Sequence, residues 1–527
     1  MEQQRNLIQR VAVGDIIART ARRYPDREAV MESRGGRDIQ LSYRELDRQV
    51  SRLARAMRGL GLQKGDRVVT ICGNSVEFVV TIYGLARGGF VWVPVNPGLS
   101  PEDAAYIIRH AEARVVVVDD LFYPVLKDVL SEIKEIRNFI YLPVGGRSVP
   151  QPFTEFSSFI KDWPEDPVED VEIWDRDLCQ IMYTSGTTAA PKGVMISHLS
   201  IFVGSLNNAI EMDIGSNTVL SCLMPLFHCA QHTFATAVLH LGGRVVVMRG
   251  FEAMRLLDTI QREKITWLFA LPGMYRAMLD HPGNGSYELS SLQTCVYAMT
   301  PMDRRTLEQA IERFGNRFML ATGQTECYPS TNSFKPEWQL LKEGNYWGVS
   351  APAVDTAVMD DEGNLLPPGE VGEIVWRGPV VMEGYLKDPE STEAARKYGW
   401  HHSGDLGYFD RDGLLVFVDR NKDMIKTGGE NVPSIKVERV ILADTRVEAC
   451  AVVGLSHPRW IEAVTALVVP RQGVKLQEDD IISYCKSKLG GFEVPKKVVF
   501  LEDLPRTTTG KIQKHVLRDK FRNLYNS

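Results

Sequence analysis

Short runs of β-branched and aromatic residues recur along this chain, and segments with helical spacing of apolar residues separate them. Such runs include "GDRVVTICGN", "ARVVVVDD", "GGRVVVMRG", "ITWLFALP", "TCVYAMTP" and "RFMLAT". Strands that alternate with helices favour mainly parallel sheets covered by helical layers. We therefore expect an α/β fold.

The segment "SYRELDRQVSRLARAMRGLG" shows how clearly one of these helices is marked. Ser42 and Glu45 have the spacing of a capping box, and Leu46, Val50 and Leu53 then recur at helical intervals. Two glycines close the segment. The sequence predicts a helix with one buried face that starts just after the serine.

The length of 527 residues exceeds what one hydrophobic core usually supports, so at least two domains are expected. The pattern of predicted strands, helices and turns changes near "FVDRNKDMIKTGGENV". Before it, the turn-rich "PPGEVGEIVWRGPVVMEGYL" indicates a small β-subdomain; after it, the chain has strands and helices of its own. We predict a large N-terminal domain of layered sheets over residues 1–419 and a small α+β domain over residues 420–527.

Composition argues against several classes of function. The chain is 44% hydrophobic and 24% charged, and its net charge of −6 gives no reason to expect a nucleic-acid partner. The first residues lack a signal-peptide core, and no uninterrupted apolar run approaches the roughly 20 residues of a membrane span. The eight cysteines are scattered without a C-x-x-C pair, which favours free thiols and a cytoplasmic location.

The stretch "IMYTSGTTAAPKGVMISH" (residues 181–198) is the strongest candidate for a ligand loop. Its hydroxyls and backbone N–H groups suit phosphate oxygens, and Lys192 adds a positive charge. The run "LCQIMYT" (residues 178–184) predicts a strand that ends at this loop, and a helix is expected from about Ser197, so the loop lies where α/β sheets bind ligands. The Walker spacing is absent. Taken alone, the stretch could equally be a polar surface turn.

Four further blocks follow in order: "TGQTE" at Thr322–Glu326, "GWHHSGDLG" at Gly399–Gly407, "DRNKDMIKTGGENV" at Asp419–Val432, and "PRTTTGKI" at Pro505–Ile512. Together with "YTSGTTAAPKGV", they resemble the signature blocks of the adenylate-forming enzymes, among them acyl-CoA synthetases, peptide-synthetase adenylation domains and beetle luciferase. The resemblance covers nearly the whole chain. Any one block is a weak signal, whereas five in order are a strong one.

The resemblance implies a two-step reaction with ATP, Mg²⁺ and coenzyme A. A carboxylic acid, fatty or compact aliphatic or aryl, is activated as acyl-AMP with release of pyrophosphate, and the acyl group then passes to a thiol. Such chemistry needs no covalent enzyme nucleophile, so catalysis is positioning and charge neutralisation. The small C-terminal domain is expected to be mobile, to alternate between the two steps, and to hinge near Lys422.

Site residues are carried over from the matching motif positions. Lys511, Thr184, Lys192 and Glu326 are the expected catalytic residues, with Glu326 beside Mg²⁺ and Lys511 bridging the acid and the adenylate. Asp405 is expected to bind the ribose hydroxyls, with Arg420 nearby. The full expected set for ATP and AMP is Thr184, Ser185, Gly186, Thr187, Thr188, Lys192, Thr322, Gly323, Thr325, Asp405, Arg420 and Lys511.

The resemblance also implies places for the acid and the thiol. His228 matches a position that gates the acyl channel. The expected acyl pocket comprises His228, Cys229, Val296, Ala298, Met299, Thr300 and Ala321, and the expected CoA channel comprises Lys426, Gly428, Gly429 and Glu430.

Several positions depart from the family pattern, and the sequence leaves some alternatives open. Thr322 replaces a common aromatic residue, Ala189 a common glycine, Lys436 an acidic residue and Ile461 a glycine. One alternative is an enzyme that loads the phosphopantetheine of a carrier protein, and another is a nucleotide-binding protein without catalysis. Dimers are frequent in the family, and the sequence does not decide whether this chain forms a homodimer.

Overall fold

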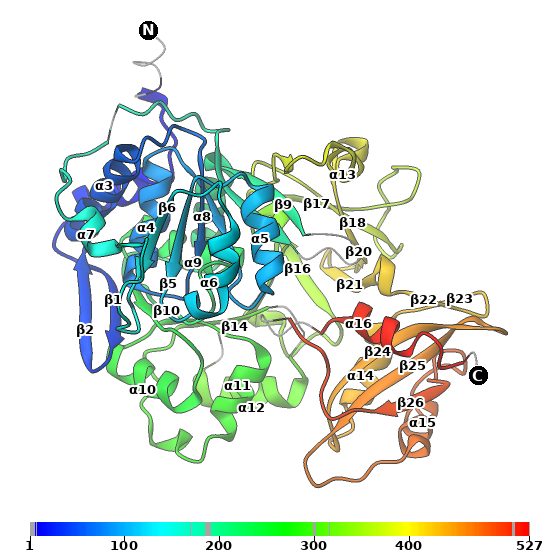
Figure 1. The fold of residues 1–527 in the computed structure, drawn as a ribbon. Coiled ribbons are helices and arrows are strands. Elements are labelled where there is room, and N and C mark those ends of the chain that lie inside the picture. Colours follow the sequence, from blue (N-terminus) through cyan, green and yellow to red (C-terminus); the bar gives the residue numbers. More distant parts are fainter. Residues whose placement is uncertain are drawn as a thin grey trace. The chain divides into compact units, whose positions relative to one another are not determined.

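The computed structural model describes residues 6, 8–168, 170–184, 191–298, 302–315, 317–507 and 512–525. By packing, the chain divides into two compact units (Figure 1). The first comprises Met1–Lys342, Gly348–Thr356 and Trp376–His401; the second comprises Glu343–Trp347, Ala357–Val375 and His402–Ser527. The boundary predicted at residue 419 falls inside the second unit, and the mobile domain that it delimits stays a prediction.

One sheet of the first unit is mainly parallel, as predicted. Strand β3 pairs in parallel with β4 and β5, β4 with β8, and β5 with β6, whereas β9 pairs antiparallel with β8 and β19. In spatial order its strands are β19 (Gly384–Tyr385), β9 (Lys192–Ser197), β8 (Leu178–Thr184), β4 (Val91–Pro94), β3 (Arg67–Ile71), β5 (Val115–Asp119), β6 (Asn138–Leu142) and β7 (Thr154–Glu155).

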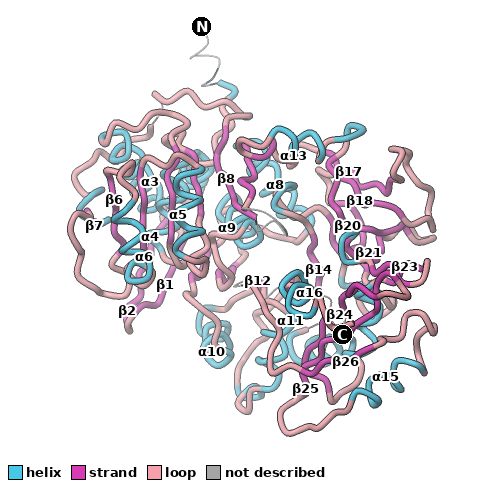
Figure 2. The backbone as a smooth tube through the Cα atoms, turned by 45° about the vertical axis from the view of Figure 1, so that its right-hand side comes forward, coloured by secondary structure: helices cyan, strands magenta, loops and turns pink. Residues whose placement is uncertain are grey.

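This sheet is buried on both faces, which explains its continuous runs of valine. Val115 and Val117 of β5 belong to one core, while Val116 and Val118 belong to the other. Side chains of α5 (Pro101–His110) and α6 (Tyr123–Glu132) form the second of these cores with the sheet. Figure 2 shows these strands as neighbouring magenta segments with helices beside them.

A second sheet of the first unit also has a parallel centre. Strands β10 to β14 run parallel to one another, β1 joins β11 in parallel, and β15 pairs antiparallel with β14. Its spatial order is β15 (Asn332–Phe334), β14 (Phe318–Thr322), β13 (Thr294–Tyr297), β12 (Trp267–Phe269), β10 (Val219–Cys222), β11 (Arg244–Val247), β1 (Glu28–Arg34) and β2 (Arg37–Ser42). The last residues of β16 (Tyr346–Ser350) pair with β15.

Helices between the two sheets complete the layered arrangement. One continuous core contains residues of both sheets together with α3 (Tyr43–Gly59), α4 (Val76–Arg87), α8 (His198–Glu211) and α9 (Cys229–Leu241). The capping box predicted for α3 is confirmed: the Ser42 side chain accepts from the Glu45 N–H, and the Glu45 carboxylate accepts from the Ser42 N–H. The other helices of this unit are α2 (Asp15–Arg23), α7 (Phe156–Ile160), α10 (Ala253–Glu263), α11 (Pro272–Asp280), α12 (Arg304–Phe314) and α13 (Pro389–Ala394).

The second unit is built around a long antiparallel hairpin. Strand β24 (Val447–His457) pairs with β25 (Ile461–Pro470), and β26 (Lys497–Phe500) joins β25 in parallel. Helices α14 (Ser434–Leu442) and α15 (Glu478–Lys486) cover one face, and α16 (Lys514–Phe521) packs in a separate core on alternate residues of the same strands. The remaining strands, some shared in part with the first unit, are β17 (Asp355–Met359), β18 (Gly372–Arg377), β20 (His401–Phe409), β21 (Leu415–Arg420), β22 (Ile425–Thr427) and β23 (Glu430–Val432).

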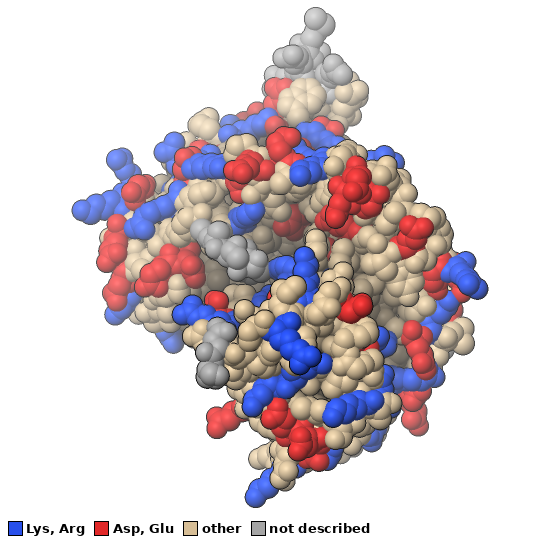
Figure 3. Space-filling view, turned by 90° about the vertical axis from the view of Figure 1, so that its right-hand side faces the viewer, with Lys and Arg blue, Asp and Glu red and all other residues tan. Residues whose placement is uncertain are grey.

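The structure also shows the state of the cysteines, the distribution of surface charge and the character of the helices. All eight cysteines are free and buried. Basic and acidic side chains are interspersed over the face shown in Figure 3. None of the helices in the described ranges combines the length and apolar character that crossing a bilayer requires.

His198 and His232 are buried in the first unit, where each is hydrogen-bonded to an uncharged group. His198 begins α8, and its Nδ1 accepts a hydrogen bond of 3.1 Å from the Val13 N–H. His232 lies on α9 and shares a hydrogen bond of 2.6 Å with the Tyr328 hydroxyl. Burial lowers the pKa of His198 to about 4 and that of His232 to about 3. Both side chains are therefore neutral in the folded protein at pH 7.

We expect these histidines to make the protein less stable in mild acid. Below pH ~6.5 the unfolded chain binds a proton at each histidine and the folded chain does not. The free energy of unfolding then falls by about 1.4 kcal/mol per pH unit for each residue, until the pH reaches the folded pKa. Urea midpoints between pH 7.5 and 5 should fall less steeply for His232→Gln than for wild type. Equal slopes of urea midpoint against pH for His232→Gln and wild type would contradict this account. The control is His515→Gln on α16, which should keep the wild-type slope.

Candidate active site

The hairpin of β8 and β9 presents the predicted phosphate loop. Thr184 ends β8 directly opposite Lys192, the first residue of β9. The predicted strand before the loop and the helix start after Ser197 are confirmed, while β9 itself was not predicted. Ser185, Gly186, Thr187 and Thr188 lie outside the described residues, as does Ala189. The pairing fixes both ends of the loop that contains them.

Lys192 is held in place by residues nearly 200 positions later in the chain. Its Nζ donates to Ser391 Oγ at 2.6 Å, lies 3.8 Å from Asp388 Oδ2, and stands 5.0 Å from the centre of the Tyr385 ring. Asp388 is the N-cap of α13 and accepts from the Ser391 N–H. The ammonium at the edge of the loop therefore has a defined position.

The block Thr322–Glu326 follows strand β14 and turns sharply at Gly323. That residue has φ of +157°, and a Cβ there would lie 2.8 Å from Pro329 Cβ, so a larger residue would clash. A short 3₁₀ turn over Thr325–Cys327 then places Glu326 beside Tyr385, whose hydroxyl donates to Glu326 Oε1 at 3.1 Å. The structure thus brings Lys192 and Glu326 to the same tyrosine.

Glu326 has the chemistry of a Mg²⁺ ligand, because hard cations prefer carboxylate and phosphate oxygens. Among the described residues, no group of three or more His, Cys, Asp or Glu side chains is arranged to hold a metal ion. Glu326 would hold a Mg²⁺ ion through its carboxylate, and the ion would supply positive charge at the phosphates of ATP. The donor set fits that role.

One of the expected acyl-pocket residues contacts the same block. Cys229, the first residue of α9, has its Sγ 3.5 Å from Thr325 Oγ1, and His228 caps the helix by accepting from the Ala230 N–H at 3.3 Å. Burial lowers the pKa of His228 to about 4 and raises that of Cys229 to about 11. Both side chains are therefore uncharged at neutral pH.

The apolar part of the expected pocket comes from two neighbouring strands. Val296 lies on β13 with Ala298 just after it, and Ala321 lies on the adjacent parallel strand β14. All three residues are buried. Met299 and Thr300 lie outside the described residues.

The second unit pairs the two residues expected to bind ribose. Asp405 on β20 is the cross-strand partner of Arg420, the last residue of β21. The Arg420 Nε lies 3.4 Å from Asp405 Oδ1, and the carboxylate is almost fully buried. The predicted hinge residue Lys422 follows in a single 3₁₀ turn over Asn421–Asp423.

The expected CoA channel residues form a tight hairpin. Lys426 lies on β22 and Glu430 on β23, and Gly428 and Gly429 join these strands with φ values of +61° and +91°. Two consecutive positive φ angles favour glycine at both positions. The Gly428 N–H donates to the Trp460 carbonyl at 2.9 Å, which places the turn beside an aromatic side chain that the sequence did not single out.

Lys511 lies outside the described residues, but the helix that follows it is firmly attached. Lys514 Nζ donates to Ser434 Oγ at 2.6 Å and lies 2.8 Å from Glu438 Oε1, while Ser434 Oγ donates to Asp419 at 2.7 Å. Burial raises the pKa of the Glu438 carboxyl, and the Lys514 ammonium opposes that shift.

A second ion pair joins the same helix to the predicted hinge. Arg518, one turn after Lys514, lies 2.7 Å from Asp423. Lys514 therefore pairs with Glu438 and Arg518 with Asp423, so two basic residues four positions apart on α16 each hold an acidic residue. Neither contact could be predicted from spacing, because the partners are far apart in the chain.

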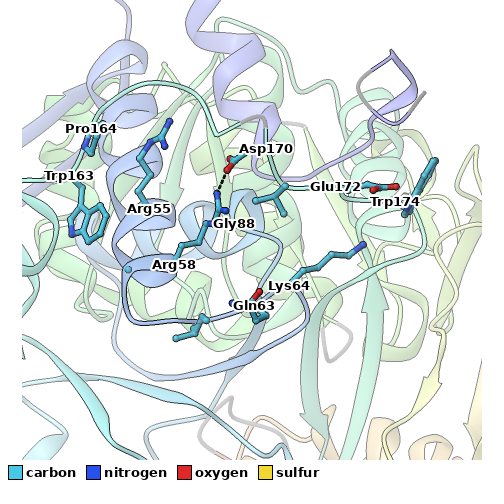
Figure 4. Close-up of a pocket in the computed structure, with 13 residues that line it drawn as sticks. Arg55, Arg58, Gln63, Lys64, Gly88, Trp163, Pro164, Asp170, Glu172 and Trp174 are labelled. Carbon is cyan, nitrogen blue, oxygen red and sulfur yellow. Dashed lines mark hydrogen bonds and ion pairs between the residues drawn. The ribbon is translucent and has the colours of Figure 1, made fainter. Parts of the chain in front are cut away.

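A cavity of about 770 Å³ lies in the first unit away from these residues. It is lined by the end of α3 and the segment that precedes β8, with Arg58 paired to Asp170 at 2.5 Å and Trp163 and Trp174 at opposite sides (Figure 4). None of the residues expected to bind ATP, the acid or CoA lines it. The candidate site therefore rests on the motif residues and their contacts.

Comparisons with known proteins cover nearly the whole chain. A family described as AMP-binding enzyme matches residues 17–386, and one described as AMP-binding enzyme C-terminal domain matches residues 436–511. A feruloyl-CoA synthase from Amycolatopsis sp is 34% identical over 510 residues, which are 97% of this chain and 99% of that protein. A 4-hydroxybutyrate–CoA ligase from Metallosphaera sedula is 32% identical over 518 residues, which cover 96% of this chain and 93% of that protein.

A solved structure is similar over the same extent. The ATP-bound MatB from Rhodopseudomonas palustris matches with a TM-score of 0.86 at 28% identity, and the match covers 97% of this chain and 99% of that one. The layered fold and the sequence motifs therefore agree with each other.

We expect Lys514→Met to destabilise the second unit strongly. Removing the ammonium leaves Glu438 buried without its cation, which typically costs about 3–5 kcal/mol. Proteolysis in increasing urea, mapped by mass spectrometry, should show residues 402–525 unfolding at lower urea, whereas Lys520→Met on the exposed side of α16 should change little. The double variant Lys514→Met with Glu438→Leu should recover most of the loss. A wild-type midpoint for Lys514→Met would contradict the account.

Proposed function

The chain belongs to the AMP-binding enzyme family, and from that premise we propose which residues carry its reaction and which kind of acid it activates. It is an acid–thiol ligase of the AMP-forming acyl-CoA synthetase type, with ATP and coenzyme A as substrates. A carboxylate oxygen attacks the α-phosphorus of ATP and displaces pyrophosphate. The thiol sulfur of CoA then attacks the acyl carbon and displaces AMP.

The proposal for the first step rests on one observation: residues from two distant motifs meet at Tyr385, and a third motif contacts one of them. Lys192 approaches the ring, Glu326 accepts from the hydroxyl, and Thr325 beside Glu326 contacts Cys229 of the acyl block. Lys192 and Thr184 neutralise and orient the β- and γ-phosphates at the ends of the loop. Mg²⁺ beside Glu326 would supply further positive charge at the phosphates when bound.

For the second unit, the proposal assigns Asp405 to the ribose and Lys511 to the developing adenylate. A carboxylate that accepts two hydroxyl donors suits a ribose diol, and Arg420 beside it fixes its orientation. Lys511 would stabilise the negative charge shared by the acid and the α-phosphate. Lys422 stays the proposed hinge between the two steps.

The surface around the Gly428–Gly429 turn supports CoA as the thiol. The Trp460 ring lies 4.3 Å from the His457 ring, and Arg459 and Lys496 stand 5.6 Å and 5.3 Å from its centre. A flat aromatic surface flanked by cations suits an adenine ring with phosphates attached. We propose that the nucleotide end of CoA binds there while its pantetheine follows the turn.

The acid is proposed to have an uncharged tail. His228, Cys229, Val296, Ala298 and Ala321 carry no charge at neutral pH, so none of them compensates a charged substrate group. Burying an unpaired charge costs several kcal/mol. The named substrates of the two relatives, an aryl acid and a hydroxyaliphatic acid, also have uncharged tails. Eight buried reduced thiols further support a cytoplasmic enzyme.

AMP formation with a panel of acids tests this proposal. Ferulate, 4-hydroxybutyrate and octanoate represent uncharged tails, while succinate and carnitine represent anionic and cationic tails. We expect at least one uncharged acid to give AMP together with CoA consumption, with kcat/KM more than about 100-fold above that of the charged acids.

Each other result has a defined meaning. Preference for a charged acid would contradict the proposed pocket. AMP release without CoA consumption would favour a carrier-protein thiol. The absence of AMP with every acid tested would contradict catalysis itself.

A further inference from the structure

Tyr385 occupies a position that the motifs do not mark. It ends the short strand β19, which pairs with β9, so that Tyr385 lies opposite Val194 and two residues from Lys192 along the neighbouring strand. The Leu386 N–H donates to the Gly193 carbonyl at 2.8 Å. The backbone therefore fixes Tyr385 beside the end of the phosphate loop.

Its side chain contacts two functional groups in different ways. The hydroxyl lies 3.1 Å from Glu326 Oε1, and because an ionised carboxylate only accepts, the phenol donates. The face of the ring lies 5.0 Å from Lys192 Nζ, within the range of a cation–π interaction.

The segment around Tyr385 ties the same two groups through other atoms. The Tyr385 N–H donates to Thr392 Oγ1 at 2.9 Å, and Thr392 Oγ1 donates to the Asp388 carbonyl at 2.8 Å. This places α13, which holds Lys192 through Ser391, in register with Tyr385. On the other side, the Met382 N–H donates to the Glu326 carbonyl at 2.7 Å. Residues 382–392 thus connect the glutamate to the lysine.

We propose that Tyr385 is a positioning residue that fixes the Glu326 carboxylate relative to the Lys192 ammonium for acyl-adenylate formation. The inference rests on the roles proposed above for Glu326 and Lys192. The two charged groups act on the same polyphosphate, so their separation decides whether both can engage it together. Tyr385 touches each with a different part of one rigid ring. Its removal should impair metal–ATP binding and adenylation, and leave thiol transfer unchanged.

The variant Tyr385→Phe isolates the hydroxyl, since it keeps the ring next to Lys192. A hydrogen bond to a charged group typically contributes about 10- to 100-fold to an equilibrium or rate. We expect a loss of that size in acid-dependent ATP–pyrophosphate exchange, and a rise in the Mg²⁺ concentration needed for half-saturation. Calorimetry with ATP and Mg²⁺ or Mn²⁺, without any acid, should show weaker binding. The rate of thiol transfer from supplied acyl-adenylate should stay within twofold of wild type. The urea midpoint should be unchanged.

Tyr484→Phe is the matched control, because that tyrosine lies on α15 of the second unit with its ring next to Lys488. It should behave as wild type in every assay. If the wild type binds metal–ATP and exchanges pyrophosphate, and the Tyr385→Phe variant does both equally well, this inference alone is overturned. A variant in which thiol transfer falls as much as exchange also overturns it, since that indicates a general structural role. A wild type that binds no metal–ATP overturns the proposed function and this inference together.

Discussion

The antiparallel pairing of β8 with β9 determines where the chemistry of the first unit can take place. Strand β8 belongs to a sheet buried on both faces, so its end is fixed by the packing of valines and isoleucines on either side. The pairing of Thr184 with Lys192 closes the phosphate loop at that fixed end. Strand β19 then joins β9 and brings Tyr385 with it, and Tyr385 reaches Glu326. The positions of Lys192 and Tyr385 thus follow from main-chain hydrogen bonds in the sheet.

Charge is distributed differently in the acyl pocket and in the second unit. Around the expected acyl block, burial keeps His228 and Cys229 neutral, which supports the proposal that the acid has an uncharged tail. In the second unit, buried Lys514 and Glu438 are retained as a pair. Such a pair is weak evidence for stability but holds a specific register between α16 and α14.

Much of the fold could be predicted because local patterns and tertiary packing agree. The Ser42–Glu45 capping box, the valine runs of β5 and the strand of residues 178–184 are confirmed, since burial on both faces leaves a clear local signal. Strand β9 was missed because its residues follow a loop and pair with a strand edge, which spacing does not reveal. The contacts of Tyr385, Asp388 and Ser391 were missed for a similar reason, as their partners lie 59 to 199 positions away. Trp460 was also missed, because only the three-dimensional structure shows that the Gly428 turn lies beside it.

The central claim is that one carboxylate oxygen of the acid becomes the bridge of an acyl-adenylate and leaves with AMP. Turnover of an acid labelled with ¹⁸O in both carboxylate positions, with ATP and CoA, tests it directly by mass spectrometry of the products. Attack on the α-phosphorus followed by thiol attack on the acyl carbon predicts one ¹⁸O atom in each AMP and one in each acyl-CoA. AMP without label, with ¹⁸O in inorganic phosphate instead, would show an acyl-phosphate route and contradict the account.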